Sequence, residues 1–307
     1  MGKASRTKVE STRREKIAAQ RAAERRAEKR RRILLATGSV VVVVAIVLVF
    51  VVVKLNSKSP SGSSSASNGP TGAALSAVVD NVTSVPASTL DTVGAGGFTG
   101  KIQPITGSPA ALTANGKPEM LYMGAEYCPY CGAARWAMIV ALSRFGTFSG
   151  LSTVHSSSTD VDPNTPTWSF YKSTYTSKYL TFTPVEMTTN VPDSSSPSGY
   201  VTLQTPSAAQ QALMNKYDVA PYTTQNGAIP FIDFGSKYVS IGSPYDPGVL
   251  AGLSWSQIAT DLKNPSSTVA QAVDGTANYI TAAICKMTGN QPASACTSAV
   301  QSIEATL

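Results

Sequence analysis

The sequence predicts an α/β fold of three layers, a mixed sheet with helices on both faces, preceded by one transmembrane helix. Two observations predict this arrangement. A run of 21 residues without a charged side chain, 33–53, is long enough to cross a bilayer as a helix. Beyond it, strand-like and helix-like segments alternate and are followed by an antiparallel pair of strands and several helices. Parallel strands joined by helices, with an antiparallel pair after them, make a small mixed sheet.

The basic residues are concentrated before this run. Residues 1–32 hold 13 of the 25 Lys and Arg together with four Glu, which leaves 12 basic and 14 acidic residues for the rest. The outer part therefore has no charge balance typical of nucleic-acid binding. Under the positive-inside rule, the tail 1–32 is cytoplasmic and the chain beyond residue 54 is extracytoplasmic. We expect a single-pass protein of the cell membrane.

A cleavable signal peptide is the alternative interpretation of the apolar run. The apolar core of a signal peptide is usually shorter and ends in a cleavage site of small residues, whereas Lys54 and Leu55 follow here. Residues 54–72 are rich in Ser and Gly and predict a flexible linker. The remaining residues, 73–307, are numerous enough to bury a core of their own, so we expect one extracytoplasmic domain.

The order of elements follows from hydrophobic pattern, β-branched content and turn residues. Strands are expected at 119–125, 151–156, 167–175, 179–185, 229–234 and 238–241, and helices at 73–82, 131–145, 207–217, 247–253, 254–262, 266–287 and 293–307. Without an inserted strand region at about 157–200, the order is β-α-β-α-β-β-α, with extra helices at the C-terminus.

Two cysteines, Cys128 and Cys131, lie where the first strand turns into the first helix. Thiol–disulfide exchange needs a thiolate, and the helix entrance favours negative charge. Pro129 suits the first helical turn because its missing N–H would be unbonded there. Cys131 lies one turn along on the same face. We therefore predict Cys128 as the nucleophile and Cys131 as the thiol that resolves the mixed disulfide.

A structural bridge or half of a zinc site would also use two such cysteines. A zinc site needs two further ligands, and the chain offers one histidine, His155, and a second cysteine pair at a different spacing. We expect no metal and no other cofactor, and a structural role for His155.

The stretch A-E-Y-C-P-Y-C, residues 125–131, resembles the active-site turn of the thioredoxin superfamily, and C-P-Y-C is the glutaredoxin form of the motif. That family has a cis-proline opposite the cysteines, at the start of the strand before its hairpin, and Ile229-Pro230 stands at this place. The longer run through C-K-M-T-G-N-Q-P-A-S-A-C is similar to a membrane-anchored, thioredoxin-like family catalogued as domain of unknown function 929. The resemblance implies a thioredoxin-like fold and redox chemistry, without an established substrate.

Further expectations follow from the resemblance. It implies that Pro230 is cis, which leaves the backbone of Ile229 to bond an extended substrate, with Pro184 as the rival position. Many thioredoxins carry a buried acid six residues before the first cysteine, where Tyr122 stands here. Glu126 matches a more exposed acidic position of the family. The direction of electron flow therefore stays open.

Several side chains lie near the cysteines in the sequence. We expect Tyr127 and Tyr130 to shape the rim of the site, Trp136 to lie in the core, and Arg135 to pair with Glu126.

The second cysteine pair, Cys285 and Cys296, encloses ten residues at the ends of two expected helices. In an oxidising compartment we expect a structural disulfide there, worth up to about 3 kcal/mol by loop entropy. A second redox pair that exchanges electrons with Cys128 and Cys131 is the alternative.

Together these features predict a membrane-anchored thiol–disulfide oxidoreductase that oxidises, isomerises or reduces extracytoplasmic protein disulfides. A redox partner in the membrane is left open, and no nucleic-acid partner is expected. Two alternatives belong to other classes. One is a non-catalytic binding or assembly module whose cysteines form stable bridges, and the other is a chaperone that holds a soft metal such as Cu(I) on its thiols.

Overall fold

A sheet of six strands organises the domain. The computed structural model describes residues 69–307, which lie within one compact unit. The sheet runs in the order β1-β12-β11-β3-β2, and β8 also pairs with β3. Three two-stranded ribbons, β4 with β7, β5 with β6 and β9 with β10, complete the strands of the described chain.

The strands are β1 Gln103–Pro104, β2 Thr113–Ala114, β3 Lys117–Gly124, β4 Gly146–Ser149, β5 Ser152–His155, β6 Pro166–Ser169, β7 Thr174–Ser177, β8 Thr181–Glu186, β9 Thr188–Pro192, β10 Tyr200–Thr202, β11 Phe231–Phe234 and β12 Tyr238–Ile241. The helices are α2 Gly72–Thr83, α3 Ala87–Val93, α4 Pro129–Ser143, α5 Ala208–Tyr217, the 3-10 helix η1 Pro247–Leu250, α6 Trp255–Asp261, α7 Thr268–Thr288 and α8 Ser298–Glu304.

Strand β3 is central and has neighbours of both directions. It pairs in parallel with β8, from Glu119 opposite Thr181 to Gly124 opposite Glu186. On its other side it pairs antiparallel with β11, which in turn pairs antiparallel with β12. The mixed sheet that the element order predicts is therefore confirmed.

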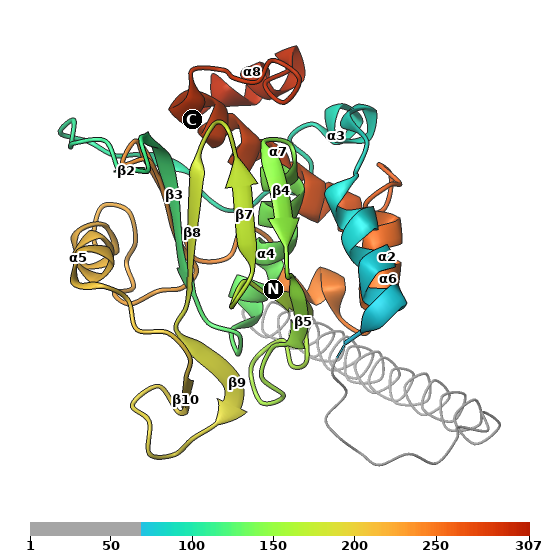
Figure 1. Cartoon of the computed structure of the whole chain (residues 1–307), viewed down its shortest axis with the longest axis vertical. Coiled ribbons are helices and arrows are strands. Elements are labelled where there is room, and N and C mark those ends of the chain that lie inside the picture. Colours follow the sequence, from blue (N-terminus) through green and yellow to red (C-terminus); the bar gives the residue numbers. More distant parts are fainter. Residues whose placement is uncertain (1–68) are drawn as a thin grey trace, which may run out of the picture. The chain divides into compact units, whose positions relative to one another are not determined.

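Alternate side chains of β3 serve two cores, because successive residues of a strand point to opposite faces. Met120 and Tyr122 join the large core that contains α4, α6 and α7. Leu121 and Met123 join a smaller core that contains Met214 of α5. Figure 1 shows α5 on one side of the sheet and α4 with α7 on the other. The three layers follow from this alternation.

Helix α4 passes through the middle of the large core. Thirteen of its 15 residues are buried, so it lacks the solvent-facing stripe of a surface helix. Trp136 is completely buried against Trp168, with ring centroids 5.1 Å apart, as its expected core position requires. Because α4 is packed along its whole length, its first turn is held in a fixed position.

The second strand of the sheet differs from the expectation. The segment expected at 151–156 forms β5, but β5 pairs with β6 and does not join the large sheet. The parallel neighbour of β3 is β8, which lies inside the region 157–200 that the sequence predicted as an insert. A strand in the sheet needs apolar groups on both faces. Strand β8 places Phe182 in the large core and Val185 in the smaller core, whereas β5 has no fully buried side chain.

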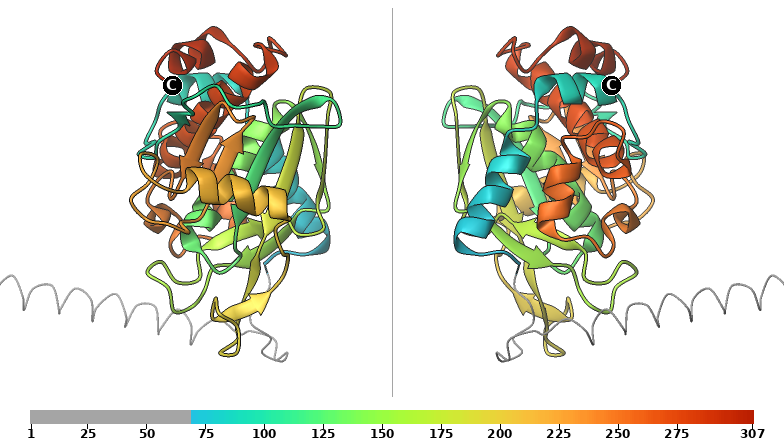
Figure 2. Two further views of the ribbon diagram at one scale, coloured as in Figure 1. Left: turned by 90° about the vertical axis from the view of Figure 1, so that its left-hand side faces the viewer. Right: turned by 90° about the vertical axis from the view of Figure 1, so that its right-hand side faces the viewer.

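The ribbon β9–β10 follows directly from the end of β8. It extends past the end of the large sheet, at the bottom of Figure 1 and of both views in Figure 2. Its strands pair only with each other. A loop from the insert region therefore stands beside the end of β3, where the chain turns into α4.

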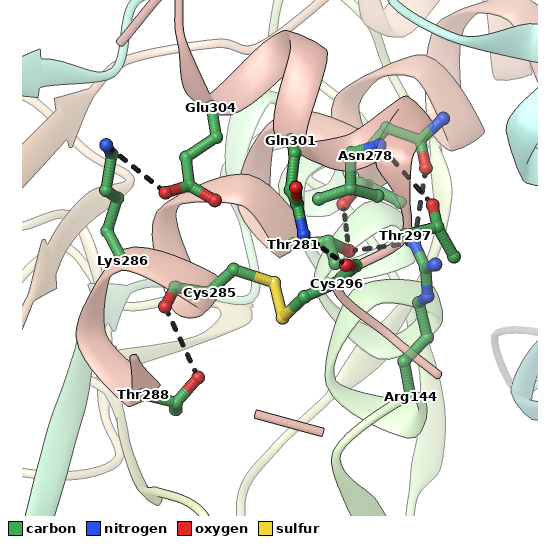
Figure 3. Close-up of a disulfide and its surroundings, with 12 residues drawn as sticks. Arg144, Asn278, Thr281, Cys285, Lys286, Thr288, Cys296, Thr297, Gln301 and Glu304 are labelled. Carbon is green, nitrogen blue, oxygen red and sulfur yellow. Dashed lines mark hydrogen bonds and ion pairs between the residues drawn. A yellow bond between two sulfur atoms is a disulfide. The ribbon is translucent and has the colours of Figure 1, made fainter. Parts of the chain in front are cut away.

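The expected disulfide between Cys285 and Cys296 is confirmed, with an S–S distance of 2.00 Å. It joins the last turns of α7 to the segment before α8 (Figure 3). Beside it, Lys286 forms an ion pair with Glu304 of α8 at 3.2 Å, and the amide of Gln301 donates to the carbonyl of Cys296 at 3.0 Å. These contacts hold α8 against α7.

Some predictions lie on residues that the structure does not describe. The basic tail 1–32, the span 33–53 and most of the linker 54–72 lie outside residues 69–307. Within residues 69–307, no helix combines the length and apolar character needed to cross a membrane.

Candidate dithiol active site

Strand β3 ends at Gly124, and α4 begins at Pro129 after four intervening residues. Cys128 is the N-cap residue of this helix, and its sulfur accepts a hydrogen bond from the backbone N–H of Cys131 at 3.3 Å. Pro129 occupies the first helical position, as expected from its missing N–H. The strand, turn and helix that the sequence predicts around the two cysteines are confirmed.

The two thiols are both free, but their surroundings differ. Cys128 keeps 4% of its surface exposed and Cys131 keeps none. A hydrogen bond from the side chain of Cys131 lowers the pKa of Cys128, and burial opposes this effect. The backbone N–H groups of Cys131 and Tyr130 and the charge of Arg135 lower the pKa further. Burial raises the pKa of Cys131 well above its ordinary value. Of the two, Cys128 is therefore the thiol that ionises first.

The segment before β11 lies across from Cys128. The peptide bond between Ile229 and Pro230 is cis, and the Cys128 thiol lies 3.9 Å from the carbonyl oxygen of Ile229. Ile229 also packs on a small cluster formed by Ala125 and the two cysteines. The rival proline, Pro184, lies within β8 opposite Tyr122, and the peptide bond before it is not cis. The structure thus brings Ile229 and Pro230 to the position that the sequence predicts.

A buried ion pair lies beneath the turn. Arg135 of α4 is fully buried, and its Nε and Nη2 donate to the two carboxylate oxygens of Glu186 at 2.8 and 2.7 Å. Its Nη2 also donates to the carbonyl of Ala125 at 2.6 Å. Burial opposes the charged guanidinium, but Glu186 outweighs it, so that the pKa of Arg135 is raised well above its ordinary value. The expected pairing of Arg135 with Glu126 is wrong.

Glu126 is also more buried than expected, with 8% of its surface exposed. Its carboxylate accepts a hydrogen bond from the hydroxyl of Ser169, and burial raises its pKa. The backbone N–H of Glu126 donates to the carbonyl of Thr188 at 2.9 Å, and the side chain of Glu126 points to Ser169 of β6. Arg135 is already bonded to Glu186, so the carboxylate of Glu126, although nearer in the sequence, bonds to Ser169 instead.

Tyr122 takes the place where many thioredoxins have an acid, and it lies close to Cys131. A Cβ on Gly124 would be 2.1 Å from the Tyr122 hydroxyl oxygen and 3.1 Å from the Cys131 sulfur. Both atoms therefore occupy the space that the missing side chain leaves. Burial raises the pKa of Tyr122 well above its ordinary value, so the phenol keeps its proton. The Tyr122 hydroxyl has no hydrogen-bond partner among the described residues.

The rim is built from residues far apart in the sequence. The ring of Tyr127 stacks on that of Tyr200 from β10, with centroids 4.2 Å apart and planes at 2°. The Tyr200 hydroxyl donates to Ser157, whose backbone N–H donates to the carbonyl of Tyr127 at 2.7 Å. Tyr130, between the cysteines, is 38% exposed. Tyr127 and Tyr130 therefore lie beside the cysteines, Tyr130 exposed and Tyr127 stacked on Tyr200.

The sequence did not indicate two residues of the site, Glu186 and Tyr200. A signal for Glu186 exists, because a carboxylate that ends a buried apolar strand needs a buried partner. Arg135, on the apolar helix α4, has the same need. Tyr200 lies in a polar Ser/Gly segment that gives no such signal. His155 packs edge-on against Trp255 at 4.6 Å, in keeping with the expected structural role.

Comparison with protein families gives two matches. The family described as Domain of unknown function (DUF929) matches residues 103–286, which is more than half of the chain. The chain belongs to this family. The DUF929 match includes both free cysteines, Pro230 and the pair Arg135–Glu186, and it ends between Cys285 and Cys296.

The second family, described as Inhibitor of host cell division protein domain, matches residues 11–68, which lie outside the range 69–307 that the structure describes. Comparison with curated proteins and with solved structures gave no match. Among residues 69–307, no group of three or more His, Cys, Asp or Glu side chains is placed to hold a metal ion.

Proposed function

We propose that this protein is a thiol–disulfide oxidoreductase with a thioredoxin-like domain, anchored by residues 33–53 and facing the extracytoplasmic side. The observation that carries the proposal is the unlike state of two neighbouring thiols. Cys128 caps a helix N-terminus and has a lowered pKa, whereas Cys131 is sealed beneath it with a raised pKa. A stable structural bridge needs no such difference, but an attacking thiol and a resolving thiol do.

The element order supports a thioredoxin-like domain. Strand β3, helix α4, parallel strand β8, helix α5, the hairpin β11–β12 and helix α7 come in this order along the chain, with the ribbon strands and the short helices η1 and α6 between them. This is the β-α-β-α-β-β-α order expected of the family. The dithiol opens the first helix of this order, and Pro230 precedes the first strand of its hairpin.

The exchange proceeds in two displacements. The Cys128 thiolate attacks one sulfur of a substrate disulfide, the substrate S–S bond breaks, and the other substrate sulfur leaves with the electron pair and takes up a proton. Cys131, once deprotonated, then attacks the Cys128 sulfur and releases the second substrate thiol. The substrate gains two electrons, and the protein is left with a Cys128–Cys131 disulfide. The reverse sequence oxidises a substrate dithiol.

Arg135 is the positioning residue of this site. Its cation favours the thiolate of both cysteines, against the effect of burial on each. It also donates to the carbonyl of Ala125, three residues before Cys128, at 2.6 Å. Glu186 keeps this cation in place without leaving a net buried charge. A cation beneath the thiols stabilises the reduced form, which favours an oxidising rather than a reducing dithiol.

Trapping of substrates in cells tests the proposal. With Cys131→Ser in the full chain, the mixed disulfide on Cys128 cannot be resolved, so protein adducts that are released by reductant should accumulate. The control Cys128→Ser/Cys131→Ser should trap none. Absence of adducts with Cys131→Ser, combined with failure of the wild-type pair to oxidise or reduce a test dithiol, would leave a non-catalytic module as the function. Stoichiometric Cu(I) binding without exchange would favour the metal chaperone.

A further inference from the structure

The large apolar side chains exposed on the described part of the chain are Tyr130, Val161, Val191 and Val201. They come from three segments, which are the C-P-Y-C turn, the loop 156–165 and the β9–β10 arm, residues 188–202. Single exposed apolar residues are normal on a protein surface. Here all four lie on segments that meet at the dithiol, which points to a contact surface.

Hydrogen bonds and one ring stack join these segments. The arm is held by the bond from the Glu126 N–H to the Thr188 carbonyl at 2.9 Å and by the stack of Tyr200 on Tyr127. The loop is held by the bond from the Ser157 N–H to the Tyr127 carbonyl at 2.7 Å. All three contacts are to residues just before Cys128. The loop and the arm are therefore fixed to the turn that carries the reacting thiol.

This surface carries negative charge. Asp160 and Asp162 lie on the loop 156–165, which the bond from the Ser157 N–H to the Tyr127 carbonyl holds beside the cysteines. In agreement with this placement, burial and then the carboxylates of Asp162, Asp160 and Asp246 raise the pKa of the Tyr130 phenol. Burial, Asp246 and Asp160 together raise the pKa of Asp162. None of the three forms an ion pair with another residue of the range 69–307. We call these three side chains the acidic rim.

The arm also offers backbone groups. Its two strands pair only with each other, so each leaves one edge without a strand neighbour. An extended segment of another chain can add to such an edge, with its side chains contacting the exposed valines. Figures 1 and 2 show the arm reaching beyond the sheet at the end where α4 begins.

We infer that the β9–β10 arm and the acidic rim dock an extended polypeptide whose reacting cysteine is flanked by basic residues. This inference rests on the proposed function and names its substrate class. The apolar side chains and strand edges suit an extended segment, and the carboxylates select Lys or Arg beside the cysteine. An anionic membrane surface is disfavoured as occupant, since the rim would repel it.

Three chromogenic disulfides test the inference on the full chain in detergent. Each carries the same nitrothiobenzoate leaving group, attached to a peptide with Lys on both sides of its cysteine, to a peptide with Glu in those positions, or to mercaptoethanol. Attack of Cys128 on the carrier sulfur releases the coloured thiolate, and Cys131 then frees the carrier as a thiol. The rate of colour release is measured at low and at high salt.

We expect the basic peptide to react about 10-fold faster than the acidic one at low salt, and the ratio to fall toward unity at high salt. Asp160→Asn/Asp162→Asn should abolish most of this preference, whereas the matched control Asp80→Asn/Asp91→Asn, on α2 and α3, should keep it. Val191→Ser/Val201→Ser should slow both peptides about threefold or more. The mercaptoethanol disulfide should react at the wild-type rate in every variant.

The outcomes separate the two proposals. If wild type reacts with the mercaptoethanol disulfide but with both peptides equally, the docking inference is overturned and the oxidoreductase stands. If the arm variants change only the oligomeric state of the chain, the surface binds a second copy and the inference is likewise overturned. If wild type reacts with none of the three disulfides, the proposed function itself fails and the inference fails with it.

Discussion

Arg135 and Glu186 are joined by two hydrogen bonds of 2.8 and 2.7 Å, and neither side chain is exposed to solvent. The pair lies between the first helix turn after Cys131 and the end of β8. Burying two charges is costly, and such a pair adds little net stability compared with apolar groups. The cation lowers the pKa of both cysteines, and on this effect rests our proposal that it positions the dithiol.

Replacing the pair should make the dithiol less oxidising. Arg135→Met/Glu186→Leu removes both charges together and so avoids an unpaired buried ion. Without the cation, the thiolate of the reduced form loses stabilisation. We expect the reduction potential to fall by about 30 mV or more, which corresponds to about 1.4 kcal/mol for two electrons. Equilibration with glutathione buffers measures it.

Arg135→Lys is the matched control, because it keeps the cation but not the planar fork. It should keep most of the wild-type potential even if the unfolding temperature falls. Equal potentials for wild type and for Arg135→Met/Glu186→Leu would show that the pair is only structural.

The side-chain hydrogen bond from the Cys131 thiol to the Cys128 sulfur should control the acidity of Cys128. That bond is the largest cause of the lowered pKa of Cys128. Cys131→Ser keeps a donor at this position and should keep the pKa low, whereas Cys131→Ala should raise it. The rate of alkylation by iodoacetamide against pH reports the pKa. Identical profiles for the two variants would contradict the assignment of this bond.

Gly124 should tolerate no side chain. In Gly124→Ala, the new Cβ would meet the Tyr122 hydroxyl oxygen at 2.1 Å and the Tyr122 ring carbon that bears it at 2.5 Å. We expect a loss of about 1–3 kcal/mol in the free energy of unfolding. Tyr122→Phe removes the closest atom and an unbonded hydroxyl, so Gly124→Ala/Tyr122→Phe should recover part of the loss. Additive effects in denaturant unfolding would show that the two residues do not interact.

Asp274 should make the stability of the domain depend on pH. It is fully buried on α7, neither carboxylate oxygen has a partner within residues 69–307, and burial raises its pKa to about 8. The folded state therefore favours the protonated acid, and stability is lost as pH rises from about 4 toward 8. Asp274→Asn should stabilise by about 2 kcal/mol at pH 8 and much less at pH 5. A thermal shift that is the same at both pH values would contradict this.

The disulfide should stabilise the fold without entering the exchange. Met287, two residues after Cys285 in α7, packs under Gly235, whose N–H donates to the carbonyl of Glu119 near the start of β3. The dithiol follows the other end of β3, roughly 15 Å away by the rise of the strand. Cys285→Ser/Cys296→Ser should cost about 3 kcal/mol.

The same variant should leave the alkylation profile of Cys128 unchanged. A shifted potential at Cys128 and Cys131 in Cys285→Ser/Cys296→Ser would indicate that the two pairs exchange electrons, contrary to a structural role.

Much of the site was accessible from the sequence because its parts are local. The place of Cys128 at the helix entrance, that of Pro129 in the first turn and that of Cys131 one turn along follow from four consecutive residues and helix geometry. The core positions of α4 follow from its apolar composition. The pairing of Cys285 with Cys296 follows from an even cysteine count and the expected compartment.

The rest depends on contacts between distant segments. Which strand lies beside β3 was predicted wrongly, because β5 precedes β8 in the chain and local pattern does not show which of them has apolar groups in both cores. The partner of Arg135 was misplaced for the same reason, since Glu126 is near in sequence and Glu186 is near in space. The β9–β10 ribbon brings Tyr200 onto Tyr127, and the polar sequence of this ribbon does not indicate where the ribbon lies in the fold.

Single-turnover exchange with a simple disulfide tests the central claim most directly. The reduced full chain is mixed with the mercaptoethanol–nitrothiobenzoate disulfide, and the protein is analysed by mass spectrometry after quenching. We predict that wild type ends as a Cys128–Cys131 disulfide, that Cys131→Ser stops at an adduct on Cys128, and that Cys128→Ser remains reduced. A wild-type protein that stays reduced, or an adduct that forms first on Cys131, would contradict the account.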